Sequence, residues 1–238
     1  MFYIAALFAV AVAENVTLPV SPLYNPHLFE GDILKEEEVD TGRTAISTHQ
    51  STWPGGRVPY LIDRSLASVA GKIRLAMYDI VQKTGGCIKF TQRTYEQNYI
   101  KFHKGVGCNS YVGRVGGGQL VSIGENCDHL GIIVHEINHA LGFFHEHTRP
   151  DRDNHLTIFW NNIQNGMATQ FQKLHPTQTK LLNSFDVNSV MLYGDTAFSK
   201  DGISKTMTAK SGKKLREVHE KTGLSVSDVY RIKKLYKC

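Results

Sequence analysis

The sequence predicts an α+β fold in which a twisted mixed sheet with packed helices is followed by a largely irregular C-terminal half. Apolar residues recur at helical spacing over residues 66–83, and again over residues 130–141. Short apolar runs bounded by turn residues indicate strands at residues 58–62, 88–90, 99–102 and 119–123. A chain of 238 residues that is 41% hydrophobic suits one globular core with additional segments.

Glycines and a capping motif mark the ends of these elements. Gly85 and Gly86 end the first helix, because glycine enters a left-handed turn without a Cβ penalty. Ser225 and Asp228 form a capping box that opens a final helix. The inward residues of this helix are Val229, Ile232 and Leu235. Residues 155–174 have a partly helical pattern, whose inward residues are Ile158, Ile163, Met167 and Phe171.

The N-terminus has the pattern of a secretion signal. Residues 2–13 are apolar and end in Ala11-Val12-Ala13, as a short signal peptide does at its cleavage site. The run is too short to span a membrane, and no later run reaches the roughly 20 apolar residues that a span needs. We therefore expect residues 1–13 to be a signal peptide, and the protein to be secreted without stable membrane insertion.

Charge divides the chain into an acidic leader and a basic body. Residues 1–43 carry two basic and seven acidic side chains, a net charge of −5, whereas residues 44–238 carry a net charge of +10. An acidic leader could lie across a positive cleft, or its charges could simply be solvated. The basic residues are scattered without an aromatic stripe, which argues against a nucleic-acid partner.

The cysteines favour two disulfides in an oxidising compartment. The four cysteines are Cys87, Cys108, Cys127 and Cys238, and none forms a CxxC pair. Four cysteines allow three pairings, and their spacing does not choose between them. Cysteine as a zinc ligand is the weaker interpretation, because histidines already complete a possible metal site.

That site is predicted by the stretch from His135 to His145. On a helix, His135 and His139 lie on one face and can bind one zinc ion, while Glu136 can reach a metal-bound water. Gly142 would end the helix and let the chain turn back, so that His145 supplies a third ligand. An amphipathic core helix with incidental histidines is the alternative, but it does not explain this glycine and the third histidine.

Three further stretches after His145 indicate which protein family the chain resembles. Residues 146–153 are EHTRPDRD, residues 189–193 are SVMLY and residues 197–200 are AFSK. With the zinc motif, these resemble the astacin family of secreted zinc endopeptidases in the metzincin clan. The resemblance implies a zincin-like, two-lobed catalytic domain over residues 44–238, with one Zn2+ per chain.

The resemblance also implies roles for individual residues. Glu136 would be the general base, Tyr193 would support the oxyanion, and Met191 would form the Met-turn below the zinc. The α-amine of the N-terminus that is created when the leader is cleaved off would be buried against Glu146. The implied disulfides are Cys87–Cys238 and Cys108–Cys127, and an extended substrate would add to the sheet edge near residues 111–114.

Within the acidic leader, Phe29-Glu30-Gly31-Asp32 resembles the F-x-G-D motif of astacin propeptides. This implies that residues 14–43 are an activation propeptide in which Asp32 binds the zinc until a trypsin-like protease cleaves at Arg43-Thr44. A Gly-Asp turn in a flexible leader is the alternative.

The sequence therefore predicts a monomeric, secreted zinc endopeptidase that is made as a zymogen and acts on protein or peptide substrates. A catalytically silent zinc-binding protein on a protease fold is the main alternative, and a structural zinc protein is a second. The positive charge of the body favours substrates with acidic residues near the scissile bond.

Overall fold

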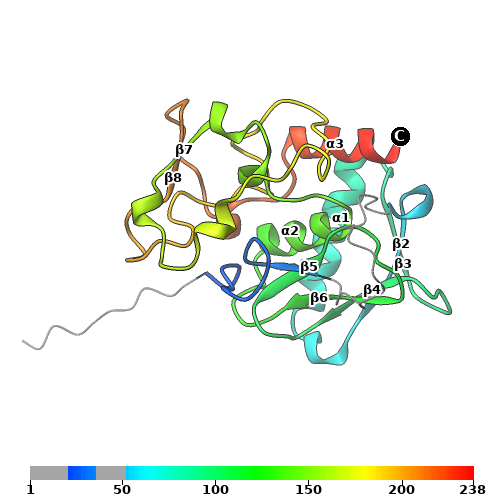
Figure 1. The fold of residues 1–238 in the computed structure, drawn as a ribbon. Coiled ribbons are helices and arrows are strands. Elements are labelled where there is room, and N and C mark those ends of the chain that lie inside the picture. The colour runs from blue at the N-terminus through cyan, green and yellow to red at the C-terminus, as the bar shows by residue number, and fades with distance from the viewer. Residues whose placement is uncertain (1–20, 36–51) are drawn as a thin grey trace, which may run out of the picture.

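The computed structural model describes residues 21–35 and 52–238. The predicted signal peptide, the rest of the acidic leader and the expected cleavage point at Arg43-Thr44 lie outside these residues. Figure 1 shows the sheet, with helices packed beside it, on one side of the molecule and the largely irregular C-terminal half on the other. The α+β prediction is confirmed.

The main sheet is mixed and has six strands in the order β1-β5-β6-β4-β2-β3. The strands are β1 (Ile33–Leu34), β2 (Arg57–Ile62), β3 (Lys89–Gln92), β4 (Tyr99–His103), β5 (Cys108–Tyr111) and β6 (Gly118–Ile123). Only the pairing of β5 with β6 is antiparallel in this sheet. The N-terminal segment, residues 21–35, thus supplies the edge strand β1 and extends the sheet beyond β5.

Three α-helices frame the core of the described residues. They are α1 (Ala70–Thr84), α2 (Leu130–Ala140) and α3 (Val226–Tyr236). Helix α1 ends at Gly85, in the left-handed conformation that we expected, but it begins later than predicted. Asp63 accepts a hydrogen bond from the Ser65 N–H and caps a separate 3-10 turn, so the chain is not yet α-helical at Leu66. The capping box of α3 is present, and Ile232 is fully buried.

The C-terminal half is held by short elements. A two-stranded antiparallel sheet joins β7 (Leu156–Ile158) to β8 (Met207–Ala209). Over the described part of the chain, including the N-terminal half, 3-10 turns lie at Pro54–Gly56, Arg64–Leu66, Glu146–Thr148, Arg152–Asn154, Trp160–Asn162, Ala168–Phe171 and Val218–Glu220. Residues 155–174, predicted to be helical in part, contain 3-10 turns at Trp160–Asn162 and Ala168–Phe171 but no α-helix, and Leu156–Ile158 instead pair with the distant strand β8. The predicted inward positions Ile163 and Phe171 are nevertheless buried.

Two disulfides fasten the fold. Cys87 pairs with Cys238, which attaches the chain end beyond α3 next to the end of α1. Cys108 pairs with Cys127, which attaches β5 to the chain that leads into α2. This is the pairing that the family resemblance implies. Among the described residues, no helix has the length and apolar character needed to cross a bilayer.

Candidate metal centre

Helix α2 carries the first part of the candidate centre through the middle of the core. Residues 131–140 are all buried. The indole Nε1 of Trp53 donates to the carbonyl of Ala140, 2.9 Å away, and so satisfies one carbonyl at the end of the helix. Gly142 has a φ of 112°, a conformation that favours glycine. The chain therefore turns away after α2, and His145 comes back to face His135 and His139.

The three imidazoles point their Nε2 atoms at one another. The Nε2 of His135 lies 3.1 Å from that of His139 and 3.1 Å from that of His145. Asp32 completes the group, because its carboxylate oxygens lie 2.9 Å from His135 Nε2 and 3.3 Å from the other two. The ligand atoms of these four residues all lie within 4.8 Å of one another.

The opposite ring nitrogens are each held by an acceptor. His135 Nδ1–H donates to the Val190 carbonyl at 2.8 Å, and His139 Nδ1–H donates to the Phe143 carbonyl at 2.7 Å. The Nδ1 of His145 lies 2.7 Å from Glu30 Oε2. A proton on Nδ1 leaves the Nε2 lone pair free to bind a metal ion, and these acceptors fix the direction of each ring.

These distances fit a tetrahedral zinc site. Zinc–nitrogen bonds of about 2.0–2.1 Å at tetrahedral angles place neighbouring nitrogens about 3.3 Å apart. The observed separations of 3.1 Å are close to that value. Three imidazoles and one carboxylate, all buried, are a donor set that zinc accepts. One metal ion can therefore be held here.

The charges in this cluster depend on one another. Burial acts to raise the pKa of Asp32, but His145 and His139 bring it well below its ordinary value. Burial acts in the opposite direction on His145, whose pKa is raised to about 9 by Asp32 and Glu30. Burial lowers the pKa of His135 to about 4. Asp32 is thus held as an anion, which suits a ligand to a cation.

Glu136 is the one acid in this region without a partner among the described residues. Neither carboxylate oxygen makes a hydrogen bond there, although the side chain is fully buried. Burial, and secondarily the negative charge of Asp32, raises the pKa of Glu136 well above its ordinary value. A buried and unpaired carboxyl group is costly for folding, so its presence points to a partner supplied during function.

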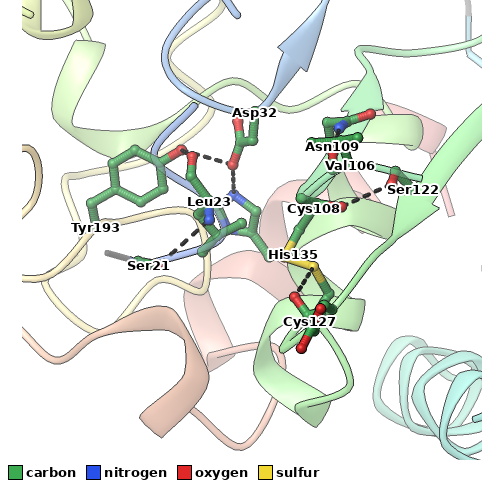
Figure 2. Close-up of a disulfide and its surroundings, with 12 residues drawn as sticks. Ser21, Leu23, Asp32, Val106, Cys108, Asn109, Ser122, Cys127, His135 and Tyr193 are labelled. Carbon is green, nitrogen blue, oxygen red and sulfur yellow. Dashed lines mark hydrogen bonds and ion pairs between the residues drawn. A yellow bond between two sulfur atoms is a disulfide. The ribbon is translucent and has the colours of Figure 1, made fainter. Parts of the chain in front are cut away.

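Residues 189–193, the predicted Met-turn, meet the centre through Tyr193. The Tyr193 hydroxyl donates to Asp32 Oδ2 at 2.7 Å (Figure 2). It also lies 2.9 Å from the Glu30 carbonyl oxygen. Burial and Asp32 raise the pKa of Tyr193, so its hydroxyl keeps its proton. Met191 is buried, and its carbonyl accepts from the Glu146 N–H at 2.9 Å. The Met-turn is thereby tied to the residue after His145.

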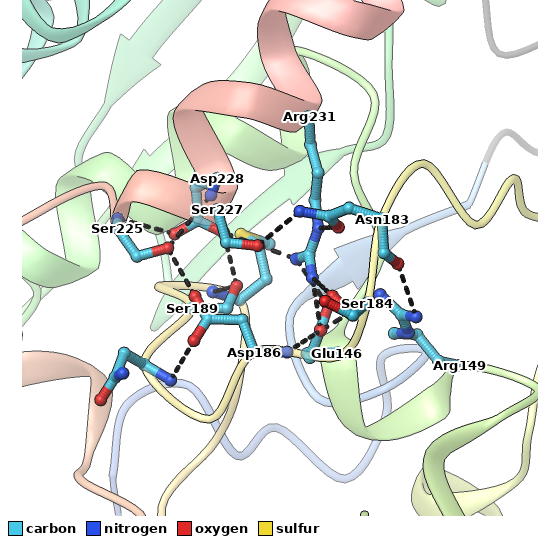
Figure 3. A network of polar contacts seen from close by, with 12 residues as sticks. Glu146, Arg149, Asn183, Ser184, Asp186, Ser189, Ser225, Ser227, Asp228 and Arg231 are labelled. Atoms are coloured by element: carbon cyan, nitrogen blue, oxygen red, sulfur yellow. Dashed lines mark hydrogen bonds and ion pairs between the residues drawn. The ribbon is translucent and has the colours of Figure 1, made fainter.

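Glu146 lies in a buried polar network (Figure 3). Its two oxygens accept from Arg231 Nη2 at 2.6 Å and Nη1 at 2.7 Å, and Arg149 Nη1 lies 3.3 Å away. A cavity of about 240 Å³ borders Glu146 and Arg231 and is also lined by residues 176–182. The predicted amine partner of Glu146 lies outside the described residues. The sequence alone does not identify Arg231 as the partner of Glu146. The only sequence feature that marks Arg231 is its position three residues after Asp228 on α3.

The N-terminal segment covers the sheet edge beside these residues. Strand β1 pairs in parallel with β5, with Ile33 opposite Ser110 and Leu34 opposite Tyr111. Further along β5, the Cys108 N–H donates to the carbonyl of Pro22 at 3.1 Å. The family resemblance implies a strand with a substrate edge around residues 111–114, whereas β5 ends at Tyr111 and begins three residues earlier. Its sequence, Cys-Asn-Ser-Tyr, has no alternating apolar pattern that could have indicated it.

Comparisons with known proteins agree with this geometry. A family model described as Astacin, a peptidase family, matches residues 45–237. Astacin-like metalloprotease toxin 2 of Loxosceles intermedia is 38% identical, over 98% of this chain and 92% of the toxin. Zinc metalloproteinase nas-6 of Caenorhabditis elegans is 37% identical, over 97% of this chain and 69% of nas-6.

A solved structure extends the likeness to the fold. High choriolytic enzyme 1, a hatching enzyme zinc-protease of Oryzias latipes, aligns with a TM-score of 0.72 at 36% identity. The alignment covers 82% of this chain and 98% of that enzyme.

Proposed function

The chain belongs to the astacin family of zinc metallopeptidases, and we propose that it is a secreted endopeptidase made as a zymogen. In this proposal residues 1–13 are the signal peptide, residues 14–43 are the propeptide, and cleavage near Arg43-Thr44 by a trypsin-like protease releases a monomeric enzyme. Membership of the family makes it a zinc-dependent hydrolase of peptide bonds in proteins or peptides.

The observation that carries the zymogen proposal is the position of Asp32. Its carboxylate lies within 3.3 Å of all three Nε2 atoms and also accepts the hydrogen bond of Tyr193. Glu30, from the same segment, contacts the far nitrogen of His145. A ligand in the fourth position prevents a catalytic zinc from binding water or substrate, since such sites need an open position.

The residues of the chain divide the reaction between them. His135, His139 and His145 would hold the zinc, which acts as a Lewis acid on the scissile carbonyl and lowers the pKa of a bound water. Glu136 takes the proton from the attacking water and passes it to the amide nitrogen as the C–N bond breaks. Tyr193, once free of Asp32, donates its hydroxyl hydrogen bond to the carbonyl oxygen as negative charge develops there.

Trypsin treatment of the secreted chain, followed by casein hydrolysis with and without a chelator, tests the enzyme. We expect hydrolysis that the chelator abolishes and added zinc restores. Glu136→Gln should keep one zinc per chain by elemental analysis and lose turnover, because glutamine cannot accept the proton. Zinc binding by the parent without any hydrolysis would favour the silent protein instead.

Latency is tested separately with Asp32→Ala in the uncleaved chain, which should hydrolyse casein faster than the uncleaved parent. Asp40→Ala is the matched control, because it removes the same charge from the same leader and should remain silent. If uncleaved Asp32→Ala is as silent as the parent, Asp32 is not the zymogen switch. N-terminal sequencing of the active enzyme checks the start at Thr44.

Secretion is supported by two disulfides and by the apolar residues 2–13. Expression in a eukaryotic secretory host should place the protein in the medium, lacking residues 1–13 by mass. Retention in the cell with those residues intact would contradict the signal-peptide assignment.

A further inference from the structure

Tyr24, in the N-terminal segment, fills a site next to the candidate centre. Its ring lies 5.1 Å from the ring of Tyr193, edge to face, and 4.9 Å from the ring of Phe198. Its hydroxyl donates a short hydrogen bond to Glu217 Oε2. We name Tyr193, Phe198 and Glu217 the Tyr24 site.

Glu217 is placed at the end of this site by its neighbours. Its other oxygen accepts from the Thr196 hydroxyl at 3.1 Å. A Cβ on Gly194 would lie 2.1 Å from Glu217 Oε1, so only glycine leaves room for the carboxylate here. Among the described residues, Glu217 makes no salt bridge. Lys221 is nearby, but its Nζ donates to the carbonyls of Ser189 and Leu192.

The chemistry of the Tyr24 site suits a long cationic side chain. Two aromatic rings can hold an aliphatic stem or a guanidinium, and the carboxylate at the far end can pair with the charged head. Asp195, whose charge also acts on Tyr24, is already paired with Lys205 at 3.0 Å. Once Tyr24 leaves, the carboxylate of Glu217 lies at the reaction centre and pairs with no charged group of the described residues.

The direction of β5 indicates which substrate residue meets this site. Antiparallel strand pairs are somewhat more stable than parallel ones, so a substrate is expected to run from the Tyr111 end of β5 towards Cys108. Pro22 pairs at the Cys108 end, and Tyr24 follows it closely. A substrate residue in the Tyr24 site therefore lies on the leaving-group side of the scissile bond.

We propose that Glu217 is a specificity-determining residue, and that the Tyr24 site receives a lysine or arginine side chain of the substrate immediately after the scissile bond. The inference rests on the proposed peptidase function. The proposed preference for basic residues differs from the acidic substrates expected from the net charge of residues 44–238. The reason is that the charge of Glu217 acts locally, at the reaction centre. Tyr24 occupies this site as a neutral mimic, with a phenol in place of the cation.

Cleavage of a peptide library by the trypsin-processed enzyme tests the subsite. Peptides that differ only in lysine, methionine or glutamate after the scissile bond should show kcat/KM for lysine about tenfold above methionine, the effect of one charged hydrogen bond. Glu217→Gln should abolish most of that ratio, and Glu217→Lys should reverse it in favour of glutamate. Glu220→Gln removes the same charge from the same turn, and should leave the ratio unchanged.

A binding measurement supplies a second readout. A synthetic peptide of residues 21–35 should inhibit the processed enzyme, and its Tyr24→Lys form should inhibit at least as well. The Tyr24→Phe form should be about tenfold weaker, because it cannot reach Glu217.

Three outcomes separate the possibilities. The proposed subsite is refuted if the peptides with lysine and with methionine after the scissile bond are cleaved equally well. It is also refuted if the Glu217→Gln enzyme keeps the preference of the parent. An effect of Glu217→Gln on the peptide inhibitor alone assigns Glu217 to propeptide anchoring and also overturns it. Absence of any zinc-dependent cleavage contradicts the proposed function itself.

Discussion

Removing the charge of Arg231 should destabilise the protein strongly. In Arg231→Met the side chain keeps most of its length but no longer donates to Glu146. Both residues are almost completely buried, with side-chain exposures of 7% for Arg231 and 4% for Glu146. The carboxylate would therefore lose its bidentate partner while its side chain stays almost completely buried.

The expected cost can be worked out from these contacts. Breaking a buried ion pair by removing one partner costs about 3–5 kcal/mol, because the remaining charge is left without compensation. Here Arg149 stays 3.3 Å from Glu146, and the Asp186 N–H still donates at 2.8 Å. The cost should therefore lie near the lower end, about 3 kcal/mol.

Urea unfolding of the full-length chain, followed by tryptophan fluorescence, measures this cost. Arg74→Met, an exposed arginine on α1, is the control and should change the free energy of unfolding by less than about 0.5 kcal/mol. The double variant Glu146→Gln/Arg231→Met should be more stable than Arg231→Met, because the stranded charge is gone. A loss below about 1 kcal/mol in Arg231→Met, or a double variant no better than the single, would refute the reasoning.

Three further predictions concern groups around the centre. Burial lowers the pKa of Lys221 to about 8, so its buried charge opposes folding at lower pH. The stability of the parent relative to Lys221→Met should thus rise between about pH 8 and 10 in urea midpoints, and a flat difference would contradict this. Gly142→Ala should cost about 1–2 kcal/mol and weaken zinc retention against a chelator, because alanine is strained at this φ of 112°. If zinc retention is unchanged in Gly142→Ala, the turn at this residue does not determine the geometry of the metal site. Trp53→Phe should cost about 1–3 kcal/mol in the same urea assay by leaving the Ala140 carbonyl without its donor, and a smaller loss would mean that water replaces the indole.

The parts of the centre that could be predicted from the sequence are those set by local spacing. Two histidines four residues apart on a helix must share a face, and a glycine at the next turn allows the chain to reverse. The capping box of α3 follows the same local logic and is present. Gly85 ends α1 as predicted, because the requirement for a left-handed residue can be seen from the glycine alone.

What could not be predicted depends on partners far away in the chain. Leu156–Ile158 become a strand because Met207–Ala209 lie beside them, and each run alternates over only three residues, too few to indicate a strand. Arg231 meets Glu146 across 85 residues, and Tyr24 meets Glu217 across 193. Such polar partners follow no periodic pattern in the sequence, so only the folded chain brings them together.

The N-terminal segment illustrates why these distant contacts matter for latency. Asp32 meets the histidines, Glu30 contacts His145, β1 covers the edge of β5, and Tyr24 fills its own site. These contacts lie within a dozen or so residues, so each is formed at high effective concentration once another is made. Loss of Asp32 alone would leave the sheet edge and the Tyr24 site covered, so uncleaved Asp32→Ala should remain slower than the processed enzyme. In the zymogen that we propose, latency would therefore be a blockade of metal, strand edge and side-chain site together, with Asp32 as its central contact.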